Sequence, residues 1–191
     1  MSNEIRSGEY VNPRGIPQAP FVETVEDYVK SRDQVEGILQ SFQEMLSKYK
    51  YMEMSTLRRA AGLREKIPDI QKTLDSVIFL DSKRDSENPT LITTFELNDT
   101  LYTKARVKAA DTVYLWLGAN VMLEYPIPEA VELLQTKLKA AKDSLAICEE
   151  DLEFLRENIT TVEVNTARVY NWDVQKRREE REEKDASAAI K

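Results

Sequence analysis

Two ladders of apolar residues with a heptad period constrain the fold of this chain more than any other feature. In each ladder the residues recur at alternating steps of four and three, which keeps one apolar seam turned toward a partner helix. Both ladders lie in one chain and have nearly equal lengths, so they predict an antiparallel coiled-coil hairpin of two long helices. The first ladder consists of Val35, Leu39, Phe42, Leu46, Tyr49, Ala60, Leu63, Ile67, Ile70, Leu74 and Val77; the second consists of Val131, Leu134, Leu138, Ala141, Leu145, Cys148, Leu152, Leu155, Ile159, Val162 and Val169.

The composition is typical of an elongated protein with a large surface. Of the 191 residues, 41% are hydrophobic and 32% are charged, whereas an average globular domain has about 25% charged residues. The net charge of −7 and the sequence pI near 4.9 argue against nucleic-acid binding, which needs clustered Lys and Arg.

No pattern in the sequence indicates catalytic chemistry. Histidine is absent, there is no glycine-rich phosphate loop, and no nucleophile and base occur at a useful spacing. The single Cys148 falls on the second ladder and is interpreted as a small core hydrophobe. We therefore expect no enzyme activity, no cofactor and no metal site.

The sequence predicts a cytoplasmic protein. Residues 1–10 are polar and do not resemble a signal peptide, and the longest mostly apolar stretch, residues 113–123, is too short to cross a bilayer. Asn98 and Asn158 each begin a glycosylation sequon, which we expect to be unused in such a protein.

Between the ladders the apolar period changes from 3.5 to two, which predicts four short strands at residues 91–97, 101–107, 113–117 and 121–125. Turn sequences at 98–100 and 118–120 join them into two consecutive β-hairpins. Large apolar side chains on both faces of so small a sheet need cover from another chain, so this region is predicted to mediate subunit assembly. The assembly residues are Phe95, Leu97, Leu101, Tyr102, Val113, Tyr114, Leu115, Trp116, Leu117, Val121, Met122 and Leu123.

The fold class is therefore α+β, mainly α: a long coiled-coil hairpin with two consecutive β-hairpins between its helices. Three prolines near the N-terminus favour a flexible arm, and Pro68 predicts a kink in the first helix. The expected organisation is an arm at 1–20, a first helix at 21–80, a four-stranded oligomerisation region at 81–127, a second helix at 128–180 and a charged, frayed tail at 181–191.

Hydrophobic residues also gather where the first helix begins and the second one ends, which this topology brings together at a free tip. They either close the last turns of the coiled coil, the ordinary role for any one of them and the expected role of Val25, or bind apolar surface on a partner. Tyr170 and Trp172 are the best candidates for binding. The tip residues are Phe21, Val22, Val25, Tyr28, Val29, Tyr170, Trp172 and Val174.

Several contiguous segments make the chain similar to the alpha-class subunits of the prefoldin family. These segments are residues 14–21 (RGIPQAPF), 97–105 (LNDTLYTKA), 115–126 (LWLGANVMLEYP), 153–161 (EFLRENITT) and 170–174 (YNWDV). The resemblance covers most of residues 14–178 and is more specific than heptads alone.

This resemblance implies a function. Members of the family are subunits of a heterohexameric, ATP-independent co-chaperone with two alpha-class and four beta-class subunits. Their hairpins build a β-barrel platform, and their coiled-coil tips capture unfolded actin and tubulin and pass them to the cytosolic chaperonin. The alternative is a structural coiled-coil tether or an adaptor subunit that binds one fixed protein partner, although a tether does not explain the two hairpins between matched helices.

Overall fold

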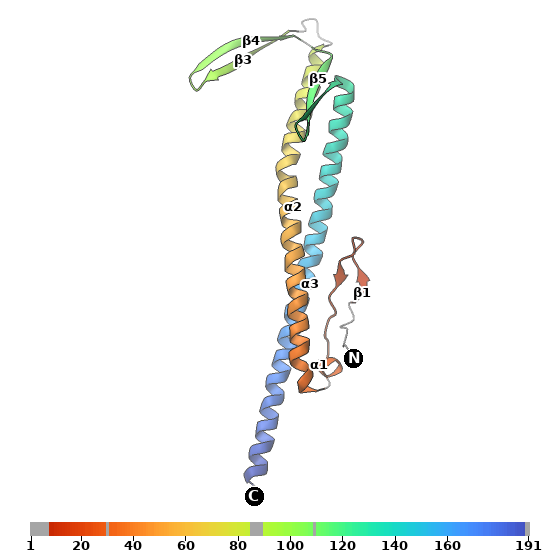
Figure 1. Cartoon of the computed structure of the whole chain (residues 1–191), viewed down its shortest axis with the longest axis vertical. Helices are drawn as coiled ribbons and strands as arrows, with labels where there is room; N and C mark the ends of the chain where they lie inside the picture. Colours follow the sequence, from red (N-terminus) through yellow and green to blue (C-terminus); the bar gives the residue numbers. More distant parts are fainter. Residues whose placement is uncertain (1–7, 30, 85–89, 109, 190–191) are drawn as a thin grey trace. The chain divides into compact units, whose positions relative to one another are not determined.

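The computed structural model describes residues 8–29, 31–84, 90–108 and 110–189 (Figure 1). It is mainly helical, as predicted, with the elements β1 (Gly8–Val11), β2 (Pro17–Gln18), α1 (Val25–Tyr28), the 3₁₀ turn η1 (Arg32–Gln34), α2 (Val35–Arg84), β3 (Thr90–Asn98), β4 (Leu101–Lys108), β5 (Thr112–Gly118), β6 (Val121–Pro126) and α3 (Ile127–Ala189). Two units make up the chain. The first unit is Met1–Arg59 with Cys148–Lys191, and the second unit is Ala60–Ile147.

The two heptad ladders lie on α2 and α3, and none of their residues is fully exposed. In the first unit the seam joins Val35, Phe42 and Tyr49 of α2 to Leu155, Val162 and Val169 of α3 in one apolar core. In the second unit Leu74 and Val77 of α2 share a core with Ala130, Leu134 and Leu138 of α3. The coiled coil is therefore built as the apolar period predicts.

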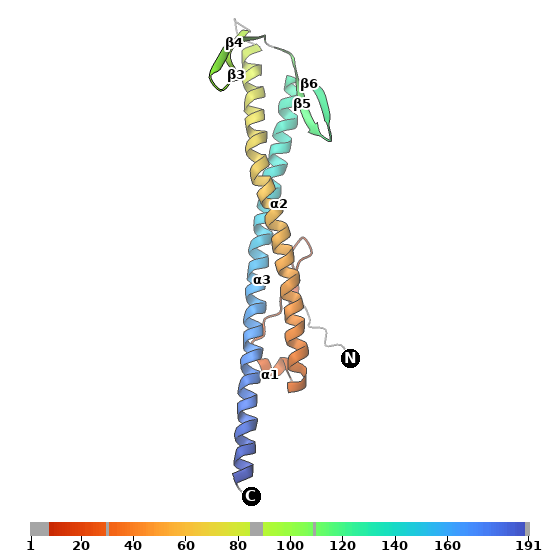
Figure 2. The ribbon, with the colours of Figure 1, turned by 60° about the vertical axis from the view of Figure 1, so that its left-hand side comes forward.

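The strands form separate two-stranded antiparallel sheets, β1 with β2, β3 with β4 and β5 with β6. In the second unit, Figure 2 shows β3–β4 and β5–β6 as two distinct hairpins. The β5–β6 turn has positive φ at Gly118 (93°), Ala119 (48°) and Asn120 (60°). A two-residue hairpin loop of type I′ requires positive φ at both of its central residues, here Ala119 and Asn120, so this turn forms as predicted.

Several boundaries differ from the sequence-based expectation. The long first helix begins at Val35 rather than near Phe21, because Ser31 is extended (φ −148°, ψ 146°) and its hydroxyl accepts a hydrogen bond from the Asp33 N–H, which starts a new helical turn. The same helix ends at Arg84, so residues 81–84 are not loop. Lys83 and Arg84 favour this ending because cations stabilise the negative end of the helix dipole. Residues 85–89 lie outside the described part.

The two termini are also more regular than expected. Residues 8–20 carry the strands β1 and β2 in place of a flexible arm, and residues 1–7 lie outside the described part. At the other end α3 continues to Ala189 instead of ending near residue 180, with side-chain pairs one turn apart such as Arg177 with Asp173. Pro68 lies inside α2, which continues through it.

Candidate functional site

The β3–β4 hairpin exposes its side chains along both strands. Leu91 and Ala105 are partly exposed, and every other described residue of the two strands is exposed. The register places Leu91 opposite Val107 and Phe95 opposite Thr103, so these positions lie on one face, whereas Tyr102 lies opposite Glu96 on the other face. The face that carries Phe95 has no cover from the described part of the chain.

The β5–β6 hairpin has one face toward the helices and one toward solvent. Leu115 is buried in the core of the second unit, and Val113 and Tyr125 pack against that core. On the opposite face Trp116 pairs with Met122, next to Tyr114, and all three are exposed. Burying an aromatic side chain is strongly favourable, so this outer face is suited to contact with another protein chain.

The predicted assembly residues therefore fall into two groups. Leu115 is buried and Val113 is partly buried, so these two hold the hairpin against the chain's own helices. The other residues of the set are exposed: Phe95, Leu97, Leu101, Tyr102, Tyr114, Trp116, Leu117, Val121, Met122 and Leu123. Two-stranded sheets are marginally stable alone and have unpaired edges. The open edges and exposed faces of these hairpins are therefore available for pairing with other strands.

The predicted tip residues lie in the first unit, and the structure separates them by burial. Val22 and Val29 are fully buried in the core, and Val25, Tyr28 and Trp172 pack against it; Val174 is also partly buried. In this conformation Val22 and Val29 offer no surface to a partner, because the segment that carries them folds back onto α3.

Only two of the predicted tip residues are exposed, Phe21 (57%) and Tyr170 (58%). The guanidinium of Arg168 lies 4.8 Å from the centre of the Phe21 ring, a cation–π contact that orients this ring. Trp172 is held by its indole N–H, which donates to Glu26 Oε1 at 3.0 Å. The exposed apolar surface at this end therefore consists mainly of the two aromatic rings.

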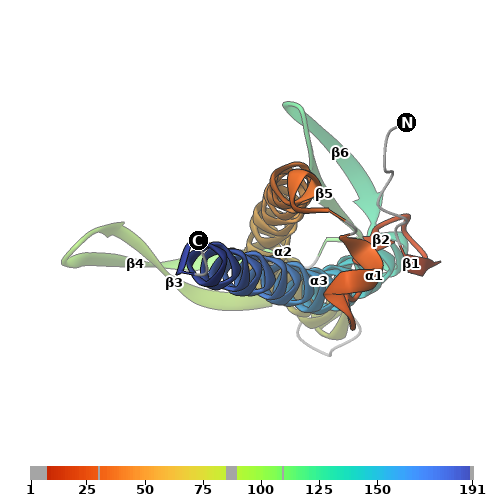
Figure 3. The same ribbon diagram turned by 90° about the horizontal axis from the view of Figure 1, so that it is seen from below.

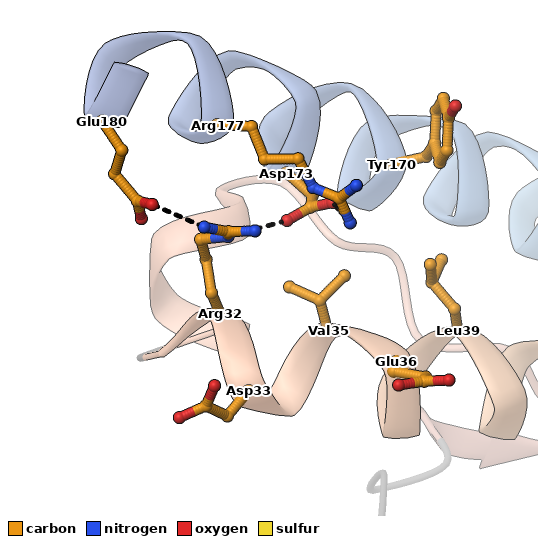
Figure 4. Close-up of a pocket in the computed structure, with 9 residues that line it drawn as sticks. All are labelled: Arg32, Asp33, Val35, Glu36, Leu39, Tyr170, Asp173, Arg177 and Glu180. Atoms are coloured by element: carbon orange, nitrogen blue, oxygen red, sulfur yellow. Dashed lines mark hydrogen bonds and ion pairs between the residues drawn. The ribbon is translucent and has the colours of Figure 1, made fainter. Parts of the chain in front are cut away.

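A pocket of about 650 Å³ lies between η1 with the start of α2 and the stretch of α3 from Tyr170 to Glu180 (Figure 4). Its polar wall is the Arg32 guanidinium, which pairs with Asp173 at 3.3 Å and with Glu180 at 2.5 Å. Asp173 is buried and also pairs with Arg177 at 2.7 Å. Because these charges are paired, the pocket wall is better suited to fixing the start of α2 than to chemistry.

Residues 12–29, named here the N-terminal strap, form an element that sequence reasoning missed. The strap lies alongside α3 (Figure 3) and is bound by side chains at seven-residue intervals on that helix. Those side chains are Asp151, Asn158, Asn165 and Trp172. The sequence feature that could have indicated the strap is the recurrence of polar residues every seven positions beside the second ladder, at Asp151, Asn158 and Asn165.

Two ionisable groups of the first unit that touch or belong to the strap have shifted pKa values. The hydroxyl of Tyr49 donates to the main-chain oxygen of Pro17 at 2.8 Å, and its burial raises its pKa. Arg14 pairs with Asp151 at 2.5 Å and with Glu150 at 3.1 Å, and the hydrogen bond to Asp151 raises the pKa of the guanidinium. Both interactions stabilise the docked strap.

Among the described residues there is no group of three or more His, Cys, Asp or Glu side chains that could hold a metal ion. Within the same residues no helix is long and apolar enough to span a membrane. Cys148 is buried on the seam, where the sequence predicted it.

Comparison with known proteins identifies the relatives of this chain. The family model "Prefoldin subunit" matches residues 49–172. A protein named prefoldin subunit 3 from Elsinoe fawcettii is 65% identical over 91% of this chain and 87% of its own length. The prefoldin subunit 3 of Saccharomyces cerevisiae is 49% identical over 94% of both chains. That of Homo sapiens is 46% identical over 85% of this chain and 83% of its own length. Subunit 3 is also the prefoldin that the segments quoted above most resemble.

Proposed function

Because the chain belongs to the prefoldin family, and is thus a chaperone subunit and not an enzyme, we propose that it acts within a heterohexamer of two alpha-class and four beta-class subunits. In this proposal the complex captures unfolded actin and tubulin without ATP and passes them to the cytosolic chaperonin. The corresponding location is the cytoplasm.

The observation that carries the proposal is the exposed apolar surface of the two hairpins. The β3–β4 hairpin has an apolar face that the described part of the chain leaves uncovered, and the outer face of β5–β6 presents Trp116 and Met122. Exposed patches of this kind on a protein mark sites of association. Strands from other prefoldin subunits would pair with the open hairpin edges and cover these faces.

We assign client capture, meaning the binding of unfolded chains, to the part of the first unit where Phe21 of the strap and Tyr170 of α3 are exposed. Phe21 and Tyr170 offer exposed rings there, and aromatic side chains bury much apolar area on contact. A single pair of rings binds weakly. Several such ends in one complex raise the effective concentration and give avidity, while each contact remains easy to break during transfer to the chaperonin.

Assembly and capture can be tested separately. For assembly, native mass spectrometry of the chain with beta-class subunits should give a six-chain particle, whereas a stable homodimer of the chain alone would favour a tether and contradict the proposal. For capture, the double substitution Phe21→Ala with Tyr170→Ala should weaken the suppression of aggregation of denatured actin by the assembled complex.

A matched control for the capture test is Tyr51→Ala, which removes an exposed aromatic ring from α2 in the same unit. The control should leave suppression unchanged. Equal losses in both variants would mean that any exposed aromatic ring contributes through nonspecific hydrophobic contact. No loss in the double variant would show that Phe21 and Tyr170 are not part of the client site.

A further inference from the structure

The bonds between the N-terminal strap and the coiled coil are made mostly to main-chain atoms of the strap. Asn165 Oδ1 accepts from the Val22 N–H at 3.0 Å, and the Asn165 amide Nδ2 donates to the Pro20 carbonyl at 2.6 Å. A primary amide side chain has one acceptor oxygen and two donor hydrogens. Asn165 therefore binds this extended chain in the way that a neighbouring β-strand would.

Other side chains of the first unit continue this main-chain recognition along the strap. Asn158 Oδ1 accepts from the Ala19 N–H at 2.5 Å, the Arg168 guanidinium donates to the Val22 carbonyl at 2.7 Å, and the Tyr49 hydroxyl donates to the Pro17 carbonyl. Main-chain N–H and C=O groups are the same in nearly every polypeptide. Binding at these atoms does not depend on the strap's sequence.

The strap side chains that are buried next to Asn158 and Asn165 are small. Ala19 and Val22 are buried in the core of the first unit together with Leu155 and Val162. Asn158 and Asn165 are buried beneath the same segment. Without the strap, this surface would be an apolar groove with ordered donors and acceptors for main-chain groups, which is suited to an extended segment with small apolar side chains.

We propose that the face of α3 around Asn158 and Asn165 is a binding site for extended polypeptide main chain, and that the strap occupies it as a displaceable cover. The occupant that replaces the strap is an extended segment of an unfolded client, so this inference rests on the proposed function and gives it a second site. The strap is tethered beside its site, which gives it a high effective concentration. The apparent affinity for a client is therefore the intrinsic affinity multiplied by the fraction of time that the strap leaves the site open.

The test releases the strap without altering the groove. Val22→Asp places a charge at a fully buried position of the strap, and Thr24→Asp is the matched control because it adds the same charge at an exposed position of the same segment. The probe is a fluorescein-labelled peptide of residues 12–24, added to the assembled complex and followed by fluorescence anisotropy. We expect the Val22→Asp complex to bind it about tenfold or more tightly than the wild-type and Thr24→Asp complexes.

Two further measurements identify the site and its ligand. Adding Asn165→Leu to the Val22→Asp complex should abolish binding of the labelled peptide. The substitution removes the side-chain amide that bonds the Pro20 carbonyl and the Val22 N–H. Reduced, carboxymethylated α-lactalbumin, a permanently unfolded chain, should displace the peptide. If the peptide fails to bind, or binds equally well after the Asn165→Leu substitution, there is no such site; if the unfolded chain does not displace it, the site serves only the strap.

A second variant covers the case in which Val22→Asp prevents assembly. Arg14→Glu replaces the ion pairs with Glu150 and Asp151 by like charges at the strap's other end, and it leaves the core unchanged. It should also increase peptide binding, and an unchanged affinity in a folded Arg14→Glu complex would overturn the inference. Peptide binding does not require client capture, so a complex that binds the peptide but fails to suppress actin aggregation would contradict the proposed function alone.

Discussion

Phe42 in the first unit is fully buried, whereas Phe95 in the second unit is 59% exposed. Phe42 lies on the seam, where α3 and the strap supply the apolar neighbours of its core. Phe95 lies on a hairpin face that the described part of the chain does not cover. The first unit therefore completes its own core, while the second unit carries apolar surface that the described part of the chain leaves exposed. The proposed function accordingly assigns assembly to the second unit and client capture to the two exposed aromatic rings of the first unit.

The largest expected effect comes from charging the uncovered surface of the second unit. Trp116→Asp with Met122→Asp places two carboxylates directly opposite each other on the outer face of β5–β6, where their burial against a partner would be strongly unfavourable. We expect complete loss of the multi-subunit particle in native mass spectrometry, with the helical circular dichroism of the chain retained.

The control for this prediction is Tyr51→Asp, which charges an exposed aromatic position on α2 in the first unit. Assembly should be unaffected. A particle that survives the double substitution would show that the outer face of β5–β6 is not part of the subunit interface.

The next effect compares the two phenylalanines directly. Phe42→Ala should lower the free energy of unfolding of the isolated chain by about 3–5 kcal/mol, because it removes a fully buried ring and leaves a cavity. Phe95→Ala should leave that free energy nearly unchanged and should weaken assembly instead. Urea denaturation followed by circular dichroism measures the first quantity, and titration with beta-class subunits measures the second. Equal destabilisation by both substitutions would contradict the division between a complete and an incomplete unit.

The features that follow local periodicity could be predicted from the sequence. The seam residues and the four strands are set by spacings of 3.5 and two, which depend only on neighbouring residues. The turn at 98–100 between two alternating segments also predicts the β3–β4 hairpin, but not its irregularity between Glu96 and Asn98, which sets the pairing of Leu91 with Val107. The exposed faces of the hairpins follow from these patterns too.

The strap could not be predicted in this way. Its prolines and few apolar residues are typical of a flexible arm, and its structure depends on bonds to side chains far away in the sequence, such as Ala19 with Asn158. For the same reason the sequence leaves open whether Val22 and Val29 pack in the coiled coil or bind a partner, whereas the structure buries both. The local sequence pattern of the strap does not show that the distant side chains of Asn158 and Asn165 bond its main chain.

A smaller effect tests how firmly the first unit holds its cover. Tyr49→Phe keeps the ring in the core but removes the hydrogen bond to Pro17, which should destabilise the docked strap by about 1 kcal/mol. Amide hydrogen exchange at Val22, whose N–H is bound by Asn165, should become roughly fivefold faster in the substituted chain, while exchange in the hairpins of the second unit stays unchanged. Unchanged exchange at Val22 would mean that the strap is held without this hydroxyl.

The smallest and most specific effect is the pH dependence of the same contact. Burial raises the pKa of Tyr49 in the folded chain above its ordinary value of about 10, so the neutral hydroxyl is favoured by folding. The stabilisation is complete below about pH 10 and is lost as the pH rises through the higher folded pKa, because the unfolded chain releases the proton first. Wild-type strap docking, measured by exchange at Val22 after correction for intrinsic rates, should therefore weaken at alkaline pH more than docking in the Tyr49→Phe chain. Parallel losses in the two chains would assign the alkaline effect to other groups and would leave the Tyr49 hydroxyl as a neutral donor only.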